Sequence, residues 1–316
     1  MNKVRWGMIG CGDVTEVKNG PGLYKCRDSE LIGVANRTDA KARDWVKRHG
    51  HGRVFASTEE LFSSPEIDIV YIAVTPDVHR ELAVRCAEAG KNCYLEKPVA
   101  LSYEEGEEIS RAFAAAGKKI FVAHYRRALP KTEKIKELLE KITPVRSVRV
   151  FRSDTQTSIP LWRGNPEIAG GGIFFEADVH LIDLLDHLFG PLDNWKLDAS
   201  GMDGMDDRAA LTARGRNGIL ISGLWQYRAY RADDFCEVFG DRGVLRFPGM
   251  STGGRAELET AQGREEIAFS EPVHVGMPLE QTIVDELLGK GTCPSTLETA
   301  LTALKICSEM RDIIRS

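Results

Sequence analysis

Five short apolar runs alternate with helix-like segments through the first 124 residues, and this alternation constrains the fold more than any other feature of the chain. The runs are VRWGMIG at 4–10, ELIGVAN at 30–36, DIVYIAV at 68–74, NCYLE at 92–96 and KIFVA at 119–123. Strand and helix patterns that alternate in this way indicate a parallel sheet with helices on both faces. We therefore expect an α/β domain with a doubly wound parallel sheet over residues 1–124.

Glycines stand just past three of the helix-like segments. The segments are Asp39–His49, Val78–Ala89 and Ser102–Ala116, and the glycines that follow them are Gly50, Gly90 and Gly117. A glycine at this position commonly adopts the left-handed conformation that ends a helix. The pattern therefore predicts both the three helices and where they end.

The pattern changes after about Leu129, where a helix is followed by a strand-rich region. Spacing predicts helices at 131–141, 173–189, 279–288 and 297–314, a strand at 145–153 and several shorter strands between 195 and 247. Glycine-containing turns at 216–218 and 241–243 join successive strands, as antiparallel hairpins require. We expect an α+β domain with a large, mostly antiparallel open sheet over 125–316, whose last helix can pack back on the first domain.

Length and composition are those of an ordinary globular protein with two domains. The chain has 316 residues, and its formal net charge of −5 gives no electrostatic reason to expect nucleic acid or an anionic membrane as a partner. No apolar run reaches the roughly 20 residues needed to cross a bilayer, and residues 1–10 lead into a glycine loop without room for a signal peptide. Seven cysteines without a CxxC pair favour a reduced, cytoplasmic protein without structural zinc.

A Gly-Cys-Gly loop follows the first apolar run directly. Gly10 permits a tight turn, Gly12 lets the backbone approach a pyrophosphate, and the helix that starts at Asp13 and Val14 offers N–H donors. Thr15 stands where the third glycine of GxGxxG is expected, and GxG alone often marks only a turn. Its place after an N-terminal strand, inside a βαβ unit, favours a dinucleotide-binding Rossmann domain.

The end of the second apolar run bears on which dinucleotide binds. An acidic residue there would bind the ribose hydroxyls of NAD, but the run ends in Asn36-Arg37-Thr38, and Asp39 comes only at the start of the next helix. A guanidinium at Arg37 suits a 2′-phosphate. This favours NADP(H) as the cofactor. The alternative is that Arg37 is a solvated residue and that NAD(H) binds.

The tripeptide Glu96-Lys97-Pro98 comes at the end of a buried strand. The carboxyl end of a strand in an open parallel sheet is where ligands bind, and a proline restricts the residue before it to extended backbone angles. Lys97 could therefore be aimed over a cleft. An ordinary surface turn with a solvated ion pair is the alternative.

Polar residues share one face of the apolar segment 173–189. Glu176, His180, Asp183 and His187 lie at i, i+4, i+7 and i+11. Buried acids and imidazoles are costly unless they are paired or functional. The face is a solvated edge, a metal site built from His and carboxylates, or an active site in which His180 exchanges a proton.

The GxG loop, the EKP tripeptide and the GGG-xxx-E-xxx-H segment at 170–180 together resemble the Gfo/Idh/MocA oxidoreductases. The resemblance covers essentially the whole chain. It implies a Rossmann domain joined to a domain with a large open sheet. It also implies hydride transfer between a nicotinamide and a carbon of a sugar, polyol or related small molecule.

The resemblance assigns the reactive residues. Lys97 matches the lysine near the nicotinamide and the reacting hydroxyl, where its charge stabilises a developing alkoxide. His180 matches the histidine that transfers a proton, and Glu176 stands where the family usually has Asp, with one more methylene. Glu176 or Asp183 would orient the imidazole. This chemistry needs no metal, so no metal site is expected.

The resemblance also implies contacts with cofactor and substrate. With Glu96 and Lys97, the segment Thr75, Pro76 and His79 is expected near the nicotinamide ribose, where Asp77 replaces a common Asn. The substrate contacts are expected from loops around Arg127, 155–163 and 225–231, with Arg127, Trp162, Arg163 and Asp183 as candidates.

Two other functions remain open beside a dehydrogenase or reductase. Some relatives of this fold bind the dinucleotide as regulators and do no chemistry, but such a protein is expected to lose Lys97 or His180, and both are present. Other relatives use transient oxidation to cleave a glycoside. An open antiparallel sheet would expose an apolar face, so a homodimer or homotetramer is expected.

Overall fold

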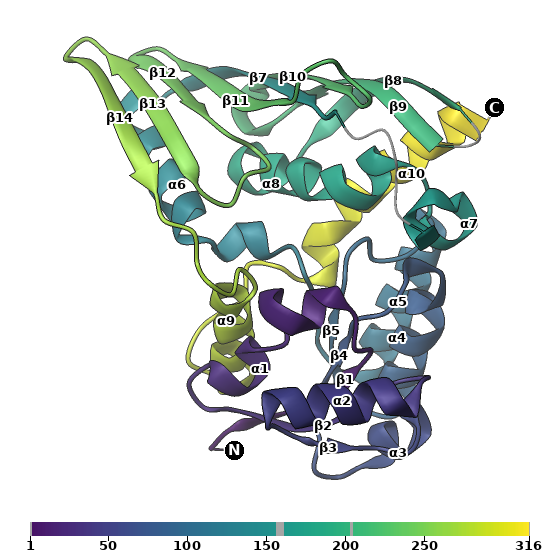
Figure 1. Cartoon of the computed structure of the whole chain (residues 1–316). Coiled ribbons are helices and arrows are strands. Elements are labelled where there is room, and N and C mark those ends of the chain that lie inside the picture. The colour runs from purple at the N-terminus through teal and green to yellow at the C-terminus, as the bar shows by residue number, and fades with distance from the viewer. Residues whose placement is uncertain (1, 156–160, 203–204, 316) are drawn as a thin grey trace. The chain divides into compact units, whose positions relative to one another are not determined.

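The computed structural model describes residues 2–155, 161–202 and 205–315 (Figure 1). The chain divides into two compact units, each built from two stretches of sequence. The first unit is Met1–Ala128 with Pro272–Leu301, and the second is Leu129–Glu271 with Thr302–Ser316. This division differs from the expected single boundary after residue 124. The segment that carries helix α9 (Met277–Leu287) and the first residues of the last helix, α10 (Leu297–Arg315), belongs to the first unit.

A six-stranded sheet forms the centre of the first unit. Its order is β3-β2-β1-β4-β5-β6, and every neighbouring pair is parallel. The strands are β1 (Val4–Ile9), β2 (Ser29–Ala35), β3 (Arg53–Val54), β4 (Ile69–Ile72), β5 (Asn92–Leu95) and β6 (Ile120–Val122). The expected doubly wound sheet is confirmed. Only the two-residue β3 was not predicted, because it is too short to give a pattern.

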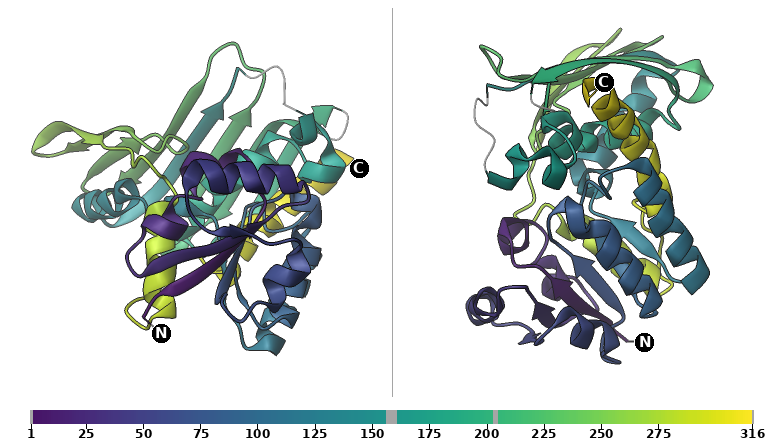
Figure 2. Two further views of the ribbon diagram at one scale, coloured as in Figure 1. Left: turned by 60° about the horizontal axis from the view of Figure 1, so that its bottom comes forward. Right: turned by 90° about the vertical axis from the view of Figure 1, so that its right-hand side faces the viewer.

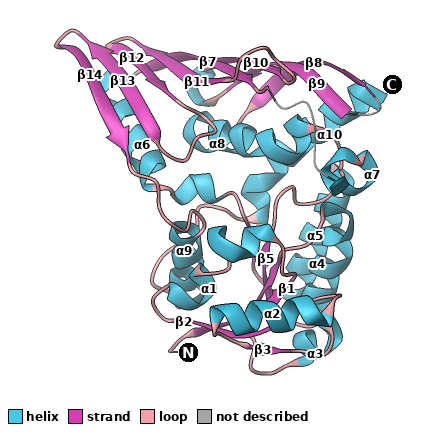
Figure 3. Cartoon of the chain, viewed as in Figure 1, coloured by secondary structure: helices cyan, strands magenta, loops and turns pink. Residues whose placement is uncertain are grey.

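The predicted helices of the first unit are present with nearly the predicted ends. They are α2 (Asp39–His49), α4 (His79–Glu88), α5 (Tyr103–Ala116) and α9 (Met277–Leu287). Two short helices, α1 (Gly22–Lys25) and α3 (Thr58–Ser63), were not predicted. Gly50 and Gly117 end α2 and α5 in the left-handed conformation, with φ of 72° and 61°. The Ser102 side chain accepts from the Glu105 N–H at the start of α5. Figure 3 separates these helices from the strands by colour.

Large side chains of the parallel strands fill the core of this unit. Trp6 and Met8 of β1, Tyr71 of β4, Tyr94 of β5 and Phe121 of β6 are all fully buried. Burial of this much apolar surface is the main stabilising contribution to such a domain. It also fixes the strand ends, and with them the loops that follow.

An eight-stranded sheet forms the second unit, in the order β14-β13-β12-β11-β7-β10-β9-β8. Its strands are β7 (Val145–Ser153), β8 (Asp193–Met202), β9 (Met205–Arg214), β10 (Leu220–Gln226), β11 (Asp233–Gly240), β12 (Gly243–Phe247), β13 (Gly254–Thr260) and β14 (Gly263–Phe269). Only β7 and β10 are parallel among the pairs of this sheet in the described residues. The expected mostly antiparallel sheet is confirmed. The β13–β14 hairpin was not predicted, because β14 is exposed and charged on both faces.

Helices lie on one face of this second sheet. They include α6 (Pro130–Ile142), α7 (Pro166–Ala169) and α8 (Val179–Phe189). No helix of the described residues covers the other face (Figure 2). The predicted continuous helix over 173–189 is wrong in one respect: a π-helical turn at Phe174–Asp178 precedes α8.

The described helices include none that is both long and apolar enough to span a bilayer. All seven cysteines lie in the described residues and none is in a disulfide.

Candidate functional site

The order of the parallel strands marks one place at the edge of the first sheet. From β1 the chain passes to β2 on one side, and it returns to β4 on the other side. Ligands of open α/β sheets bind outside the carboxyl ends of the strands where the order reverses in this way. The loops that follow β1, β2, β4 and β5 therefore form the candidate cofactor site.

The two glycines after β1 have opposite surroundings. Gly10 has a φ of 100°, and a Cβ on it would lie 2.1 Å from the Ala73 carbonyl oxygen, so only glycine fits. Apart from its two chain neighbours, no described residue has an atom within 4 Å of a Cβ built on Gly12. The backbone at Gly12 is thus open to a ligand, and the loop fits the pyrophosphate of a dinucleotide.

The helix expected after this loop is wrong in length. Residues Val14–Lys18 form a π-helical turn of 5 residues, in which the Asn19 N–H donates to the Val14 carbonyl. The buried Thr15 closes the turn, because its hydroxyl donates to the Gly12 carbonyl at 2.7 Å. Asp13 is exposed at the start of the turn. Such a short turn has little of a helix dipole, so N–H groups rather than the dipole would hold a phosphate.

An exposed arginine, Arg37, follows the end of β2. Arg37 is exposed and makes no ion pair with any of the described residues. Its neighbour Asn36 donates a side-chain hydrogen bond to the Thr38 carbonyl at 2.9 Å. Asp39 pairs with Arg43 one turn along α2, at 2.6 Å. The strand end therefore presents a guanidinium and not a carboxylate.

His79 connects the segments that follow β4 and β5. Its ring is fully buried, with Nδ1 2.9 Å from the Pro98 carbonyl oxygen and Nε2 3.1 Å from the Val74 carbonyl oxygen. Burial lowers the pKa of this imidazole. Both ring nitrogens face the protein main chain. His79 thus braces the turn at Thr75 and Pro76 against the EKP segment.

Glu96 is buried and not solvated. Its Oε1 accepts hydrogen bonds from the Tyr71 hydroxyl and the Asn19 amide, each at 2.6 Å, and its Oε2 lies 3.3 Å from the Lys97 N–H. Burial raises the pKa of Glu96, while these hydrogen bonds and the Lys97 charge oppose that rise. The Lys97–Pro98 peptide is cis. The surroundings of Glu96 argue against an ordinary solvated turn.

Arg127 is buried in the first unit. Its Nη1 donates to the Pro294 carbonyl at 3.3 Å and its Nη2 to the Thr299 carbonyl at 3.0 Å. The guanidinium therefore holds the segment before α10 and the first turn of α10 to the turn after β6. Contact with a substrate stays a prediction for this residue.

In the second unit, a buried carboxylate holds the start of the π-helical turn. Asp206 of β9 accepts hydrogen bonds from the N–H groups of Gly172 (3.0 Å), Phe174 (2.9 Å) and Phe175 (3.4 Å). A Cβ on Gly172 would lie 2.4 Å from Asp206 Oδ1, which explains the glycine. Burial raises the pKa of Asp206 to about 6, although the N–H donors favour its charged form.

A second buried acid holds the end of the same turn. Asp178 accepts a short hydrogen bond from the Tyr227 hydroxyl, and Arg152 Nε lies 3.6 Å from its other oxygen. Burial raises the pKa of Asp178 to about 7. No sequence pattern singles out Asp178 or Asp206, because their partners are remote in the chain. Trp225, in a predicted substrate loop, is instead buried edge-on against Phe174.

Three of the predicted site residues of the second unit lie together. Arg163 Nε is 3.3 Å from Glu176 Oε1, and its guanidinium lies over the Trp162 ring at 5.1 Å. His180 and Asp183 are buried on α8, so the polar face is not a solvated edge. Residues 156–160 of the predicted substrate loop lie outside the described residues. Among those described, no three His, Cys, Asp or Glu residues are grouped to hold a metal.

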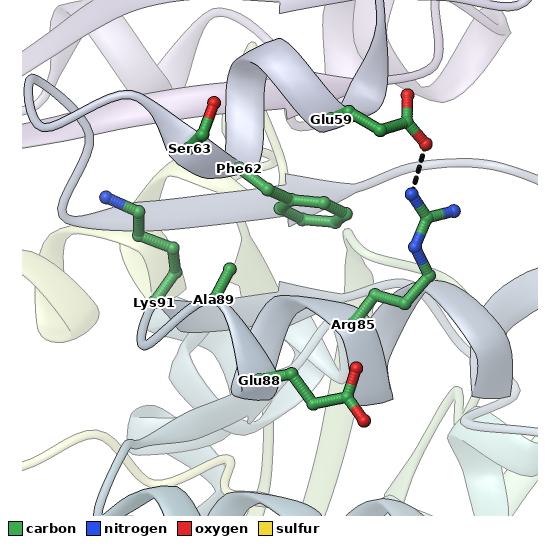
Figure 4. A pocket seen from close by; sticks show the side chains of 7 residues that line it. All are labelled: Glu59, Phe62, Ser63, Arg85, Glu88, Ala89 and Lys91. Carbon is green, nitrogen blue, oxygen red and sulfur yellow. Dashed lines mark hydrogen bonds and ion pairs between the residues drawn. The ribbon is translucent and has the colours of Figure 1, made fainter.

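An open hollow elsewhere in the first unit is unrelated to these residues. It lies between α3 and α4 and is lined by Glu59, Phe62, Ser63, Arg85, Glu88, Ala89 and Lys91 (Figure 4). Lys91 precedes β5, so the hollow lies at the amino ends of the strands. The Lys91 ammonium donates to the Ser64 and Ile67 carbonyls at 2.6 and 2.9 Å, which is a structural role.

The sheet order and the glycine loop define the first unit as a dinucleotide-binding Rossmann domain. Comparison with known proteins agrees: residues 4–124 match the model of an oxidoreductase family with an NAD-binding Rossmann fold, and residues 132–246 match the GFO/IDH/MocA C-terminal domain. The chain is 34% identical to Oxidoreductase P35 of Formosa agariphila over 308 residues, 95% of each chain. It belongs to the Gfo/Idh/MocA family of oxidoreductases, as the sequence motifs indicated.

Solved structures share the fold over nearly the whole chain. The aldose-aldose oxidoreductase of Caulobacter crescentus, in complex with glycerol, has a TM-score of 0.86 at 19% identity, over 99% of this chain and 98% of that one. A levoglucosan dehydrogenase, in complex with NADH and levoglucosan, has a TM-score of 0.83 at 19% identity, over 99% and 97%. The protein is thus an oxidoreductase with a nicotinamide-dinucleotide domain.

Proposed function

We propose that this oxidoreductase is an NADP(H)-preferring dehydrogenase or reductase of a sugar, a polyol or a related small alcohol or carbonyl compound. The observation that carries the proposal is the environment of Lys97, which follows a buried, hydrogen-bonded Glu96 at the carboxyl end of β5. The unit that holds this lysine also holds the open Gly12 backbone. Names of relatives, such as aldose-aldose oxidoreductase, support the substrate class.

When bound, the nicotinamide supplies the group that accepts or donates hydride. The side chains of the protein stabilise charge and transfer the proton. The Lys97 ammonium stabilises negative charge on the reacting oxygen, and His180 takes or gives its proton. Glu176 is held by Arg163 at 3.3 Å, so its carboxylate has a fixed direction despite the added methylene. Asp183, buried on α8, is the other candidate for orienting the imidazole.

A spectroscopic screen tests the proposal. NADPH or NADP⁺ is mixed with a panel of aldoses, polyols and anhydrosugars, and the nicotinamide absorbance is followed. A change with at least one compound is expected. Tight cofactor binding without any change would instead favour a regulator, and release of an aglycone from a glycoside without net change in the nicotinamide would favour a glycosidase.

Arg37 is the proposed reader of the 2′-phosphate. Fluorescence titrations, with the five tryptophans as donors, should give tighter binding of NADPH than of NADH. Arg37→Ala should weaken NADPH binding about tenfold, or about 1.4 kcal/mol for one lost charged contact, and leave NADH binding unchanged. Arg43→Ala, which removes an exposed arginine of α2, is the matched control. Tighter NADH binding by the unaltered protein would contradict the preference.

We also propose that the uncovered face of the second sheet joins copies of the chain into a homodimer or homotetramer. Leu220 and Leu224 of β10 are 53% and 49% exposed on that face, and Leu224 is in register with Phe151, which stacks on Phe235. Light scattering on the purified protein checks this.

The unpaired cysteines suit the cytoplasm, and a net charge of −5 argues against nucleic acid as a partner.

A further inference from the structure

A group of buried polar side chains lies behind the EKP segment, inside the first unit. Its members are Asn19, which follows the π-helical turn, Tyr71 of β4, Tyr94 and Glu96 at β5, and Glu280 of α9. All are fully or almost fully buried. The roles proposed above use only Glu96, and the sequence motifs point to none of the other four.

Asn19 is the centre of this group. Its amide nitrogen donates to the Tyr71 hydroxyl at 3.1 Å and to Glu96 Oε1 at 2.6 Å, so both N–H bonds are used and the direction of the amide is set. Its Oδ1 faces Gly276, where a Cβ would lie 2.1 Å away. This oxygen has no hydrogen-bond partner among the described residues.

Glu280 fills space that two glycines leave. A Cβ on Gly22 would lie 1.4 Å from its Oε2, and a Cβ on Gly276 would lie 3.1 Å from its Oε1. Gly276 therefore borders both Glu280 Oε1 and Asn19 Oδ1. Neither carboxyl oxygen of Glu280 has a hydrogen-bond partner in the part of the chain that the structure describes.

Among the described residues, the ionisable groups that interact with Glu280 carry no positive charge. They are the Glu96 carboxyl and the Tyr94 phenol from β5 and the Cys26 thiol after α1. Each of these groups is neutral or negative. Two carboxyls and an amide oxygen in one buried group repel one another unless one carboxyl carries a proton. Burial, and then the Glu96 charge, raise the pKa of Glu280 well above its usual range.

We propose that Glu280 is a positioning residue, held as a neutral carboxylic acid that directs its proton towards Asn19 Oδ1 and so fixes the amide that aligns the charged Glu96 behind Lys97. Of the two buried carboxyls, Glu280 thus carries a proton and Glu96 carries a negative charge. The effect on turnover rests on the proposed function. The protonation state does not.

The charge on Glu96 explains why this arrangement matters for Lys97. If Glu280 ionised, its charge would oppose that of Glu96, and either Glu96 would take up a proton or the Asn19 amide would turn. Both changes alter the field and the backbone contact next to Lys97. Glu280→Gln imitates the neutral acid, because its amide N–H₂ can donate to Asn19 Oδ1 and cannot ionise.

Infrared spectroscopy of the folded protein tests the protonation state without any substrate. The spectrum of the unaltered protein minus that of Glu280→Gln should contain the carbonyl stretch of a protonated carboxylic acid at neutral pH, while any band from Asp178, whose pKa is about 7, is common to both spectra and cancels. Asp285→Asn is the matched control, because Asp285 lies on the same helix, half-buried, and accepts a hydrogen bond from Gln281 at 3.0 Å. The control should keep the band. Equal spectra for the unaltered protein and Glu280→Gln would overturn the proposal.

Unfolding as a function of pH gives a second, independent test. A group whose pKa is higher in the folded state contributes stability that is present at low pH and lost as pH rises towards the folded value. The ratio of folded to unfolded protein should therefore fall up to tenfold more per pH unit in the unaltered protein than in Glu280→Gln. The same dependence of stability on pH in the unaltered protein and in Glu280→Gln would overturn the proposal.

The pH dependence of kcat shows whether Glu280 positions Glu96 or only stabilises the fold. Turnover of the unaltered protein should fall on the alkaline side as Glu280 ionises, and in Glu280→Gln this fall should move to higher pH. Identical profiles would contradict a role in aligning Glu96. If no substrate were found, the proposed function would fail, while the infrared and unfolding results would still decide the state of Glu280.

Discussion

The carboxyl edge of the first unit and the π-helical turn of the second are held in place by different means. At the edge, backbone geometry decides the arrangement: Gly10 takes a φ of 100° and Gly12 leaves its backbone open. Around the turn at Phe174–Asp178, two buried acids bind donors from distant parts of the chain. Asp206 accepts from main-chain N–H groups at the start of the turn, and Asp178 accepts from the Tyr227 hydroxyl. The first arrangement depends on local sequence, and the second depends on long-range burial of charge.

The largest effect is expected at the glycine loop, where two neighbouring glycines can be compared. Gly10→Ala places a methyl group 2.1 Å from the Ala73 carbonyl oxygen at a positive φ, and we expect a loss of at least about 3 kcal/mol in the free energy of unfolding. Gly12→Ala meets no atom within 4 Å and should fold normally. It should instead weaken dinucleotide binding, because the methyl group stands where the pyrophosphate approaches.

Denaturant unfolding and the cofactor titration check these two changes. Normal stability of Gly10→Ala, or unchanged cofactor affinity of Gly12→Ala, would show that local backbone geometry does not control this edge.

A somewhat smaller effect is expected at Asp206. Asp206→Asn replaces one of the accepting oxygens by an N–H₂ group that faces the N–H groups of Gly172, Phe174 and Phe175. We expect a loss of about 2 to 3 kcal/mol in the free energy of unfolding. Turnover should also fall, because Glu176 directly follows Phe175, whose N–H group donates to Asp206. Asp207→Asn, at the half-buried neighbour, should cost less than about 1 kcal/mol. Equal effects of the two changes in thermal unfolding would refute the role of Asp206.

The smallest effect, counted per pH unit, is the dependence of stability on pH that Asp178 causes. The pKa of Asp178 is about 7 in the folded protein and about 3.9 in an unfolded chain, so folding binds a proton. The stabilisation is complete below about pH 3.9 and falls by up to about 1.4 kcal/mol per pH unit as pH rises towards 7. Asp178→Asn should flatten this slope in unfolding measurements between pH 4 and 8, a range that also includes the pKa of Asp206, about 6. An unchanged dependence of the free energy of unfolding on pH would contradict the raised pKa of Asp178.

The sequence predicted the first region better than the second for a physical reason. Strand ends, helix-ending glycines such as Gly50 and Gly117, and the loop at Gly10 leave marks within a few residues. The contacts of Asp206 with Gly172 and of Glu96 with Asn19 join residues 34 and 77 positions apart. No periodicity records such pairs, and they depend on how the chain is packed.

The two π-helical turns were missed for the same reason. Both were predicted as the beginnings of ordinary helices, because a π-helical turn does not change the apolar pattern of a short segment. In the structure one turn is closed by Thr15 on the Gly12 carbonyl and the other by Asp206. The polar residues of the candidate site were named from the sequence and stay predictions, and the groups that surround them in the structure were not predicted.

The most direct test of the central proposal is a comparison of Lys97→Met with the unaltered protein in steady-state turnover and cofactor titration. Lys118→Met, which removes an exposed lysine next to β6, is the matched control. Lys97→Met should abolish turnover and keep cofactor affinity within a few-fold, because the proposed mechanism assigns stabilisation of the reacting oxygen to the lysine and binding of the dinucleotide to the glycine loop. Near-normal turnover in Lys97→Met would contradict the proposed chemistry.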